Sequence, residues 1–91
     1  TKTMTSKSER EIKMELDIRG QTIEEGLIEV DRFIDSCVLS GVGSVTIIHG
    51  KGTGALRDAV HTHLKRHRNI KSHRLGVYGE GESGVTIAEI K

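Results

Sequence analysis

The residues best suited to chemistry stand in one short turn, "HGKGTG" at residues 49–54, between a run rich in β-branched residues and a helical pattern. Alternate glycines let a backbone approach a ligand closely. A strand-to-helix turn also gathers unpaired N–H groups at the positive end of the helix dipole. The turn therefore predicts a phosphate site. Its expected contacts are Gly50, Lys51, Gly52, Thr53, Gly54 and Arg57.

Two nucleotide-binding motifs can be compared with this turn. A Walker A loop requires a Gly-Lys pair followed by Ser or Thr, which the sequence lacks. The string "GKGTGA" fits the permissive dinucleotide pattern, but the acid expected about 20 residues later would fall within residues 70–74, whose charged residues are all basic. The phosphate of a polymer is therefore the favoured ligand. A small-molecule nucleotide and a tight turn that binds nothing remain alternatives.

Histidines supply the candidate acid or base. His49 ends the predicted strand immediately before the turn, so it is either a proton-transfer group beside the phosphate or a buried hydrogen-bonding residue. His63 and His67 lie one helical turn apart, but the Lys and Arg between them would repel a dication, so a solvated basic face is the favoured interpretation. His61 and His73 have no partner visible in the sequence.

Charge is distributed unevenly along a chain whose net charge is +1. Residues 9–35 carry nine acids against four Lys and Arg, whereas residues 51–74 carry seven Lys and Arg against one acid. The second segment predicts a positive field that attracts polyanions, with a solvated helix face as the alternative. Aromatic residues are scarce, which leaves Tyr78 as a platform for base stacking. The expected phosphate contacts here are Lys65, Arg66, Arg68 and Arg74.

Length and composition limit the class of protein. A chain of 91 residues forms one domain with a thin core of Ile, Leu and Val, since it has one Phe, one Tyr and no Trp. The single cysteine, Cys37, excludes an intramolecular disulfide and is expected in that core. No signal peptide or membrane-length apolar run is present, so a cytoplasmic protein without a membrane partner is expected. Residues 1–10 are predicted to be linker from a longer chain, with the domain over residues 11–91.

Apolar periodicity predicts the elements that position these residues. Alternation from Ile12 to Ile18 predicts a strand, and a capping box of Thr22 and Glu25 begins a helix that Gly41 ends. The predicted order is strand, helix, strand, helix, strand, strand, which is an α/β arrangement. The helix stripes are expected at Ile23, Leu27, Val30, Ile34, Cys37 and Val38 and at Leu56, Ala59, Val60, His63 and Leu64, and the later strands at 45–49, 70–78 and 85–90.

The sheet is expected to carry both helices on one side, because each helix has a single apolar stripe and the first strand has one polar face. Right-handed crossovers make the first three strands mostly parallel, and a hairpin returns the fourth strand antiparallel. Asp17 and Arg19 then end one strand where His49 and Gly50 end the next. Ligands bind at the carboxyl ends of parallel strands, so His49 is expected to face Asp17 and Arg19 there.

Three motifs carry a family resemblance: "LDIRG" at 16–20, "IHGKGTGALR" at 48–57 and "GESGVTI" at 81–87. In this order and spacing they resemble the Smr (small MutS-related) domain, most closely the version at the C-terminus of the second bacterial MutS paralogue. The resemblance implies a two-layer βαβαββ sandwich whose four-stranded mixed sheet has the order 1-2-4-3. It also implies DNA-nicking or RNA-cleaving endonuclease activity. The family motifs map to Leu16, Asp17 and Arg19 and to His49, Gly50, Gly52 and Gly54, and stand-alone relatives often have His where this chain has Arg19.

The resemblance gives two hypotheses for function. In the first, the turn holds a scissile phosphate of DNA or RNA while Arg19 and Lys51 offset its charge. His49 then transfers a proton, and Asp17 orients a neighbour or helps to bind a divalent metal such as Mg²⁺ or Mn²⁺. In the second, the domain is a non-catalytic module that docks on branched DNA, ribosomal RNA or the ribosome.

The same resemblance supplies the wider setting. The parent paralogue is associated with suppression of recombination and with ribosome rescue, and its ATP would be bound by a part of the protein that precedes this domain. The parent is expected to be a homodimer and the isolated domain a monomer.

Overall fold

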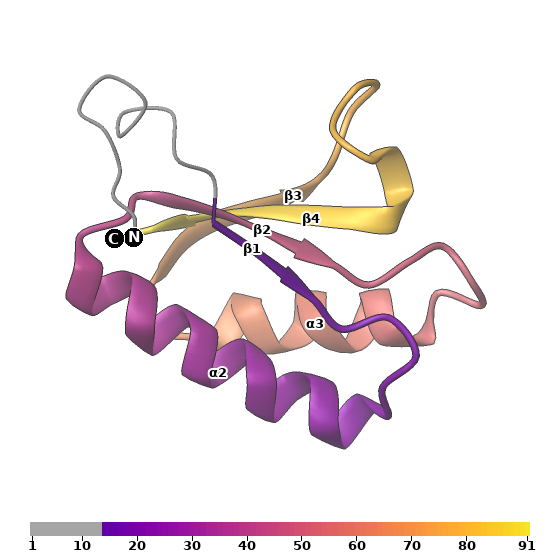
Figure 1. Cartoon of the computed structure of the whole chain (residues 1–91), viewed down its shortest axis with the longest axis horizontal. Helices are drawn as coiled ribbons and strands as arrows, with labels where there is room; N and C mark the ends of the chain where they lie inside the picture. The colour runs from indigo at the N-terminus through magenta and orange to yellow at the C-terminus, as the bar shows by residue number, and fades with distance from the viewer. Residues whose placement is uncertain (1–13) are drawn as a thin grey trace, which may run out of the picture.

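A computed structural model describes residues 14–91 as a sheet covered by two helices. Figure 1 shows both helices on the same face of the sheet. The predicted linker at 1–10, and Ile12 at the predicted start of the first strand, lie outside the described residues. The elements are β1 (Met14–Asp17), α2 (Ile23–Ser40), β2 (Ser44–Ile48), α3 (Ala55–Arg66), β3 (Ile70–Leu75), η1 (Glu82–Gly84) and β4 (Val85–Ile90).

The sheet has the strand order β1-β2-β4-β3, which confirms the order that the resemblance implies. β1 and β2 pair in parallel, and β4 lies antiparallel between β2 and β3. β3 therefore runs in the same direction as β1 and β2, as predicted, but it does not pair with either of them. β4 separates it from β2 because the hairpin brings the last strand back into the middle of the sheet.

α2 begins at the capping box that the sequence predicts. Thr22 Oγ1 accepts from the Glu25 N–H at 3.1 Å, and the Glu25 carboxylate accepts from the Thr22 N–H at 3.2 Å. Gly41 ends the helix with φ +74°, a conformation that favours glycine. The expected stripe is buried in its middle, but Ile23 and Val38 are 45% and 40% exposed. They stand at the two ends of an 18-residue helix, which is longer than the strands that it covers.

The core lies between the sheet and the two helices. It includes inward-facing side chains of β2 and β4, the α3 residues Val60 and Leu64, and the predicted core residue Cys37. Burial raises the pKa of the Cys37 thiol. Gly26 marks the close packing of α2, because a Cβ there would lie 3.3 Å from Leu56 Cδ1. No helix within residues 14–91 is long and apolar enough to cross a membrane.

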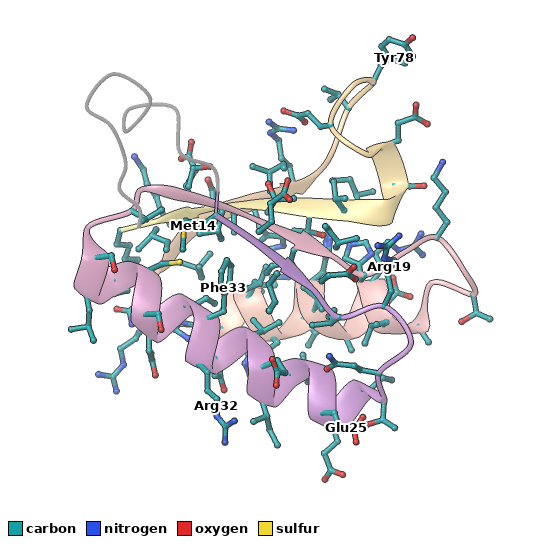
Figure 2. The ribbon with its side chains drawn as sticks, viewed as in Figure 1. Met14, Arg19, Glu25, Arg32, Phe33 and Tyr78 are labelled. Atoms are coloured by element: carbon teal, nitrogen blue, oxygen red, sulfur yellow. The ribbon has the colours of Figure 1, made fainter. Side chains whose placement is uncertain are left out.

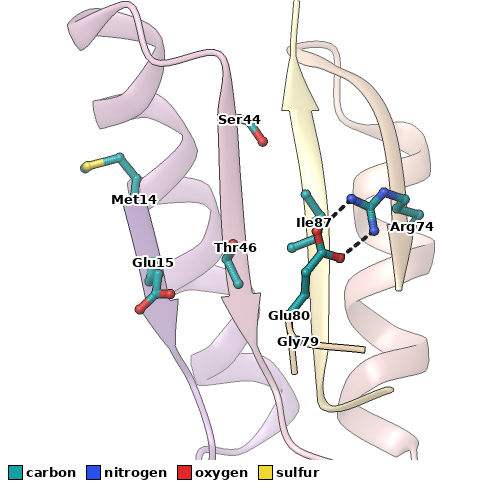
Figure 3. A pocket seen from close by; sticks show the side chains of 8 residues that line it. All are labelled: Met14, Glu15, Ser44, Thr46, Arg74, Gly79, Glu80 and Ile87. Carbon is teal, nitrogen blue, oxygen red and sulfur yellow. Dashed lines mark hydrogen bonds and ion pairs between the residues drawn. The ribbon is translucent and has the colours of Figure 1, made fainter. Parts of the chain in front are cut away.

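The other face of the sheet is open, as predicted. It contains a hollow of about 320 Å³ between the outward-facing residues of β1, β2 and β4 and the loop after β3 (Figure 3). The β3–β4 hairpin rises on this side, away from the helices (Figure 1). Tyr78 lies at its tip and is 92% exposed (Figure 2).

Candidate functional site

The glycine turn leaves the end of β2 and leads into the first turn of α3. The N–H groups of His49 and Gly50 both donate to the carbonyl of Gly84, at 3.1 and 2.9 Å, which fixes the start of the turn against the end of η1. Gly50 has φ +83° and Gly54, the N-cap of α3, has φ +88°. The turn therefore depends on glycine at both of its ends.

Backbone N–H groups of the turn are available to a ligand. Among the hydrogen bonds within residues 14–91, none uses the N–H of Lys51, Gly52, Thr53 or Gly54. Thr53 Oγ1 accepts from the Ala55 N–H at 3.2 Å. The turn lines a hollow of about 380 Å³, which also includes Arg57 and residues 21–23. The sequence prediction places six contacts in this turn, and the structure gathers all six around one hollow: Gly50, Lys51, Gly52, Thr53, Gly54 and Arg57.

Arg19 reaches the same turn from the open face of the sheet (Figure 2). A second hollow, of about 440 Å³, is lined by Arg19, Gly50 and Lys51 together with residues of the β3–β4 loop. A Cβ on Gly50 would lie 3.3 Å from Arg19 Cγ, so the two residues approach closely. Lys51 Nζ also lies 3.6 Å from a carboxylate oxygen of Glu82. Two of the predicted catalytic cations are therefore neighbours.

Asp17 holds one edge of the Arg19 guanidinium through two hydrogen bonds. Arg19 Nη2 donates to Asp17 Oδ2 at 2.6 Å, and Arg19 Nε donates to Oδ1 at 2.9 Å. The Arg19 side chain and backbone N–H lower the pKa of the Asp17 carboxyl to about 2 through these hydrogen bonds. The carboxylate in turn raises the pKa of Arg19. Asp17 therefore acts on the site through the orientation of Arg19.

His49 is a buried hydrogen-bonding residue, one of the two alternatives from the sequence. The residue is 5% exposed, with Nδ1 3.0 Å from the Gly50 carbonyl oxygen and Nε2 2.8 Å from Thr86 Oγ1. Asp17 pairs with Ile48 across β1 and β2, so the next residue, His49, points to the opposite face. The strand ends meet as expected, but the side chains of His49 and Asp17 lie on different sides of the sheet.

Two residues beside His49 were not identified as site residues from the sequence. Thr86 faces inward from β4 and is fully buried, and His61 Nε2 lies 2.8 Å from the same Thr86 Oγ1. The ring centroids of His61 and His73 are 4.9 Å apart. Burial, followed by the charges of His73 and His49, lowers the pKa of His61. A hydroxyl in the buried phase of an apolar strand was the only local signal for this cluster.

The remaining predicted phosphate contacts lie away from the turn. Lys65 and Arg66 occupy the last turn of the 12-residue helix α3, and Arg68 follows it. With a rise of about 1.5 Å per residue, the last turn is roughly 15 Å from the first residue of the helix. Arg74 lies on the open face and makes two hydrogen bonds to the Glu80 carboxylate, at 2.8 and 3.1 Å (Figure 3). This carboxylate raises the pKa of Arg74.

His63 and His67 have a carboxylate partner that the sequence did not reveal. Their Nε2 atoms lie 2.7 and 3.5 Å from the same oxygen of Asp31 on α2. Across residues 14–91, no group of three or more His, Cys, Asp or Glu side chains is arranged to hold a metal ion. The pair therefore joins α3 to α2.

Comparisons with known proteins agree with this fold. The sequence model of the Smr domain family matches residues 16–91. The chain is 56% identical over 80 residues to "Endonuclease MutS2" of Brevibacillus brevis and 50% identical over 91 residues to the protein of that name in Staphylococcus saprophyticus. These matches cover 88% and 100% of this chain, which spans only 10% and 12% of the two relatives.

Two solved structures share the architecture. The Smr domain of Thermus thermophilus MutS2 superposes with a TM-score of 0.84 and 38% identity, covering 86% of this chain and 98% of that one. YdaL, described as a stand-alone small MutS-related protein from Escherichia coli, superposes with a TM-score of 0.80 and 25% identity, covering 85% of this chain and 63% of that one.

Proposed function

This chain belongs to the Smr domain family, and from that membership we propose that it is a nucleic-acid-binding domain that nicks phosphodiester bonds of DNA or RNA at the glycine turn. The observation that carries the proposal is the turn itself. Unpaired N–H groups, Lys51 and Arg57 surround one hollow, and Arg19 reaches the turn from the other side. This arrangement suits a phosphate within a nucleic-acid strand, because the strand can continue out of the site on both sides of that phosphate.

Charge stabilisation is the principal contribution that these residues would make. The turn N–H groups would hold a non-bridging phosphate oxygen, and Lys51 and Arg19 would offset the charge that grows on the pentavalent transition state. Asp17 keeps the Arg19 guanidinium in one orientation. Arg19 supplies a permanent cation where stand-alone relatives often have a titratable His. His49 serves as an acid or base only in a state where one of its two ring hydrogen bonds has opened.

A resident divalent metal does not fit the donors at this turn. Both oxygens of Asp17 accept hydrogen bonds from Arg19, and the nearest carboxylate to Lys51 is the exposed Glu82. No cluster of metal ligands occurs within the described part of the chain. We therefore derive no step through Mg²⁺ or Mn²⁺, and an EDTA arm tests this part of the proposal.

The experiment is a cleavage assay on supercoiled plasmid and on single-stranded RNA, each with and without EDTA. The native chain should produce nicked or shortened products. His49→Ala should lower turnover about 100-fold, because it removes the contacts that shape the turn. Asp17→Ala should lower it by a smaller factor, because Arg19 keeps its charge and loses its orientation. Unchanged turnover in both variants would contradict this site.

A second candidate function is a docking module that binds without cutting. The distance between Lys65, Arg66 and Arg68 and the turn favours it, since these cations can hold a polyanion without reaching the scissile bond. Tight binding of DNA or RNA with no product in the cleavage assay would select this alternative. In either case we propose the setting that the resemblance implies: recombination suppression and ribosome rescue by a longer, cytoplasmic, homodimeric parent.

A further inference from the structure

A chain of three side chains connects α3 to the glycine turn beneath the sheet. His61 Nε2 lies 2.8 Å from Thr86 Oγ1, and the same hydroxyl lies 2.8 Å from His49 Nε2. His49 Nδ1 then lies 3.0 Å from the carbonyl oxygen of Gly50. Thr86 is fully buried and His49 is 5% exposed, so these groups satisfy one another rather than water.

The number of hydrogens fixes the direction of this chain. A carbonyl oxygen only accepts, so His49 Nδ1 carries a hydrogen, and in neutral His49 the Nε2 atom is a bare acceptor. The Thr86 hydroxyl must then donate its single hydrogen to His49 Nε2. Its oxygen can accept only from the Nε2–H of His61. With two neutral imidazoles, this is the one arrangement in which all three contacts are hydrogen bonds.

The carbonyl that His49 holds belongs to the first peptide of the phosphate site. The described peptide bonds are trans, so the C=O of Gly50 and the N–H of Lys51 point in opposite directions. When His49 holds the carbonyl on the buried side, the Lys51 N–H is directed away from the core. That N–H has no acceptor among residues 14–91. His49 thus orients a donor of the turn.

We propose that Thr86 and His61 are positioning residues of the phosphate site, because together with the Gly50 carbonyl they favour the Nδ1–H tautomer of His49 and thereby hold the orientation of the Gly50–Lys51 peptide. The inference rests on the proposed function for its consequence, but the tautomer is a property of the protein alone. His49 itself is then a positioning residue.

The surroundings of His61 keep it neutral at and above neutral pH, as this arrangement requires. His61 is half-buried, and it faces His73 from β3 and His49, the residue after β2. Burial first, then His73, His49 and Arg57, lower its pKa, and Asp58 opposes them weakly. A neutral His61 donates from a single nitrogen, and Thr86 takes that hydrogen bond.

The test reads the tautomers directly in the 91-residue chain, by long-range ¹H–¹⁵N imidazole spectra recorded above neutral pH. The native chain should show His49 as the Nδ1–H form and His61 as the Nε2–H form. Thr86→Val, which keeps the shape and removes the hydroxyl, should raise the share of the Nε2–H form at His49, because the Gly50 carbonyl alone then selects the tautomer. Thr86→Ser should restore the native share. Thr62→Val, the same change at an exposed threonine of α3, is the matched control and should leave both signals unchanged.

Binding of a short oligonucleotide supplies the second measurement. Thr86→Val should weaken binding about fivefold, the value of one lost hydrogen bond, and Thr86→Ser should recover most of that loss. If Thr86→Val does not fold, His61→Leu against His61→Gln repeats the test, because Gln retains an N–H donor and Leu does not. The proposal is overturned if native His49 is the Nε2–H form, or if Thr86→Val or His61→Leu leaves the ratio of the two His49 tautomers unchanged. Failure of the native chain to bind any DNA or RNA would overturn the proposed function and leave the tautomer result intact.

Discussion

Both ends of α3 carry cations, but the helix dipole favours the cations at one end and disfavours those at the other. At its C-terminal end, Lys65 and Arg66 meet the negative end of the helix dipole, which favours a cation by about 0.3–1 kcal/mol each. At its N-terminal end, Lys51 and Arg57 lie beside the positive end, where a cation is disfavoured by a similar amount. Helix stability therefore explains the first pair and opposes the second. Arg57 Nε donates to an Asp58 carboxylate oxygen at 3.1 Å, and Lys51 Nζ lies 3.6 Å from Glu82. The phosphate that we propose would be a further anionic partner for both cations.

The largest difference between the two ends should appear when a single lysine is removed. Lys51→Ala should lower turnover about 100-fold, since preorganised groups at a developing charge contribute about that much. The same variant should melt at an equal or higher temperature, because it removes a cation from the positive end of the dipole. Steady-state kinetics and thermal unfolding measure the two effects.

Lys65→Ala is the matched control for Lys51→Ala. It should leave turnover within about twofold and slightly lower the melting temperature, because it removes a cation from the favourable end of the helix. Equal losses of turnover in the two variants would show that the two ends of α3 do not differ in their contribution to catalysis.

Charge reversal at the C-terminal end of α3 should have a smaller effect, and it should change binding rather than turnover. Replacement of Lys65, Arg66 and Arg68 by Glu should weaken binding of DNA or RNA. The slope of log affinity against log salt concentration should become shallower by about 0.7–0.9 per lost phosphate contact. Turnover with saturating substrate should remain near the native value, because these residues lie far from the turn. Affinity measured across a series of salt concentrations tests the first part. Unchanged affinity would show that this end is only a solvated face.

Local patterns account for what could be predicted from the sequence. The glycine spacing of the turn, the capping box of Thr22 and Glu25, and the alternation in β1 each depend on a few neighbouring residues, and the structure contains all three. The order of the four strands is not local, and it was available only through the family resemblance. The sequence also treated the cations of residues 51–74 as one group, although the length of α3 separates the cations at the start of this segment from those near its end.

The side-chain partners of His49 show why the rest could not be predicted. A shift of one residue in strand register moves every side chain to the other face, so the relation of His49 to Asp17 depends on the pairing of Asp17 with Ile48. Thr86 and His61 are far from His49 in the sequence, and only the insertion of β4 beside β2 brings Thr86 under the turn. A histidine at a strand end could therefore be identified, but its hydrogen bonds could not.

The smallest expected effect concerns the pair of Asp17 and Arg19. Loss of this pair at low pH sets the lower pH limit at which Arg19 keeps its orientation. The pKa of Asp17 is lowered from its usual 3.8 to about 2, so its pairing with Arg19 stabilises the fold above pH 3.8 and this contribution is lost as the pH falls towards 2. Because both side chains are exposed, the loss should be slight, and it should be absent in Asp17→Asn. Unfolding measured between pH 5 and 2 in the two proteins tests this, and identical acid limbs would contradict it. Since Asp17 stays ionised throughout the neutral range, Arg19 keeps its orientation there, and any pH dependence of turnover near neutrality must come from other groups.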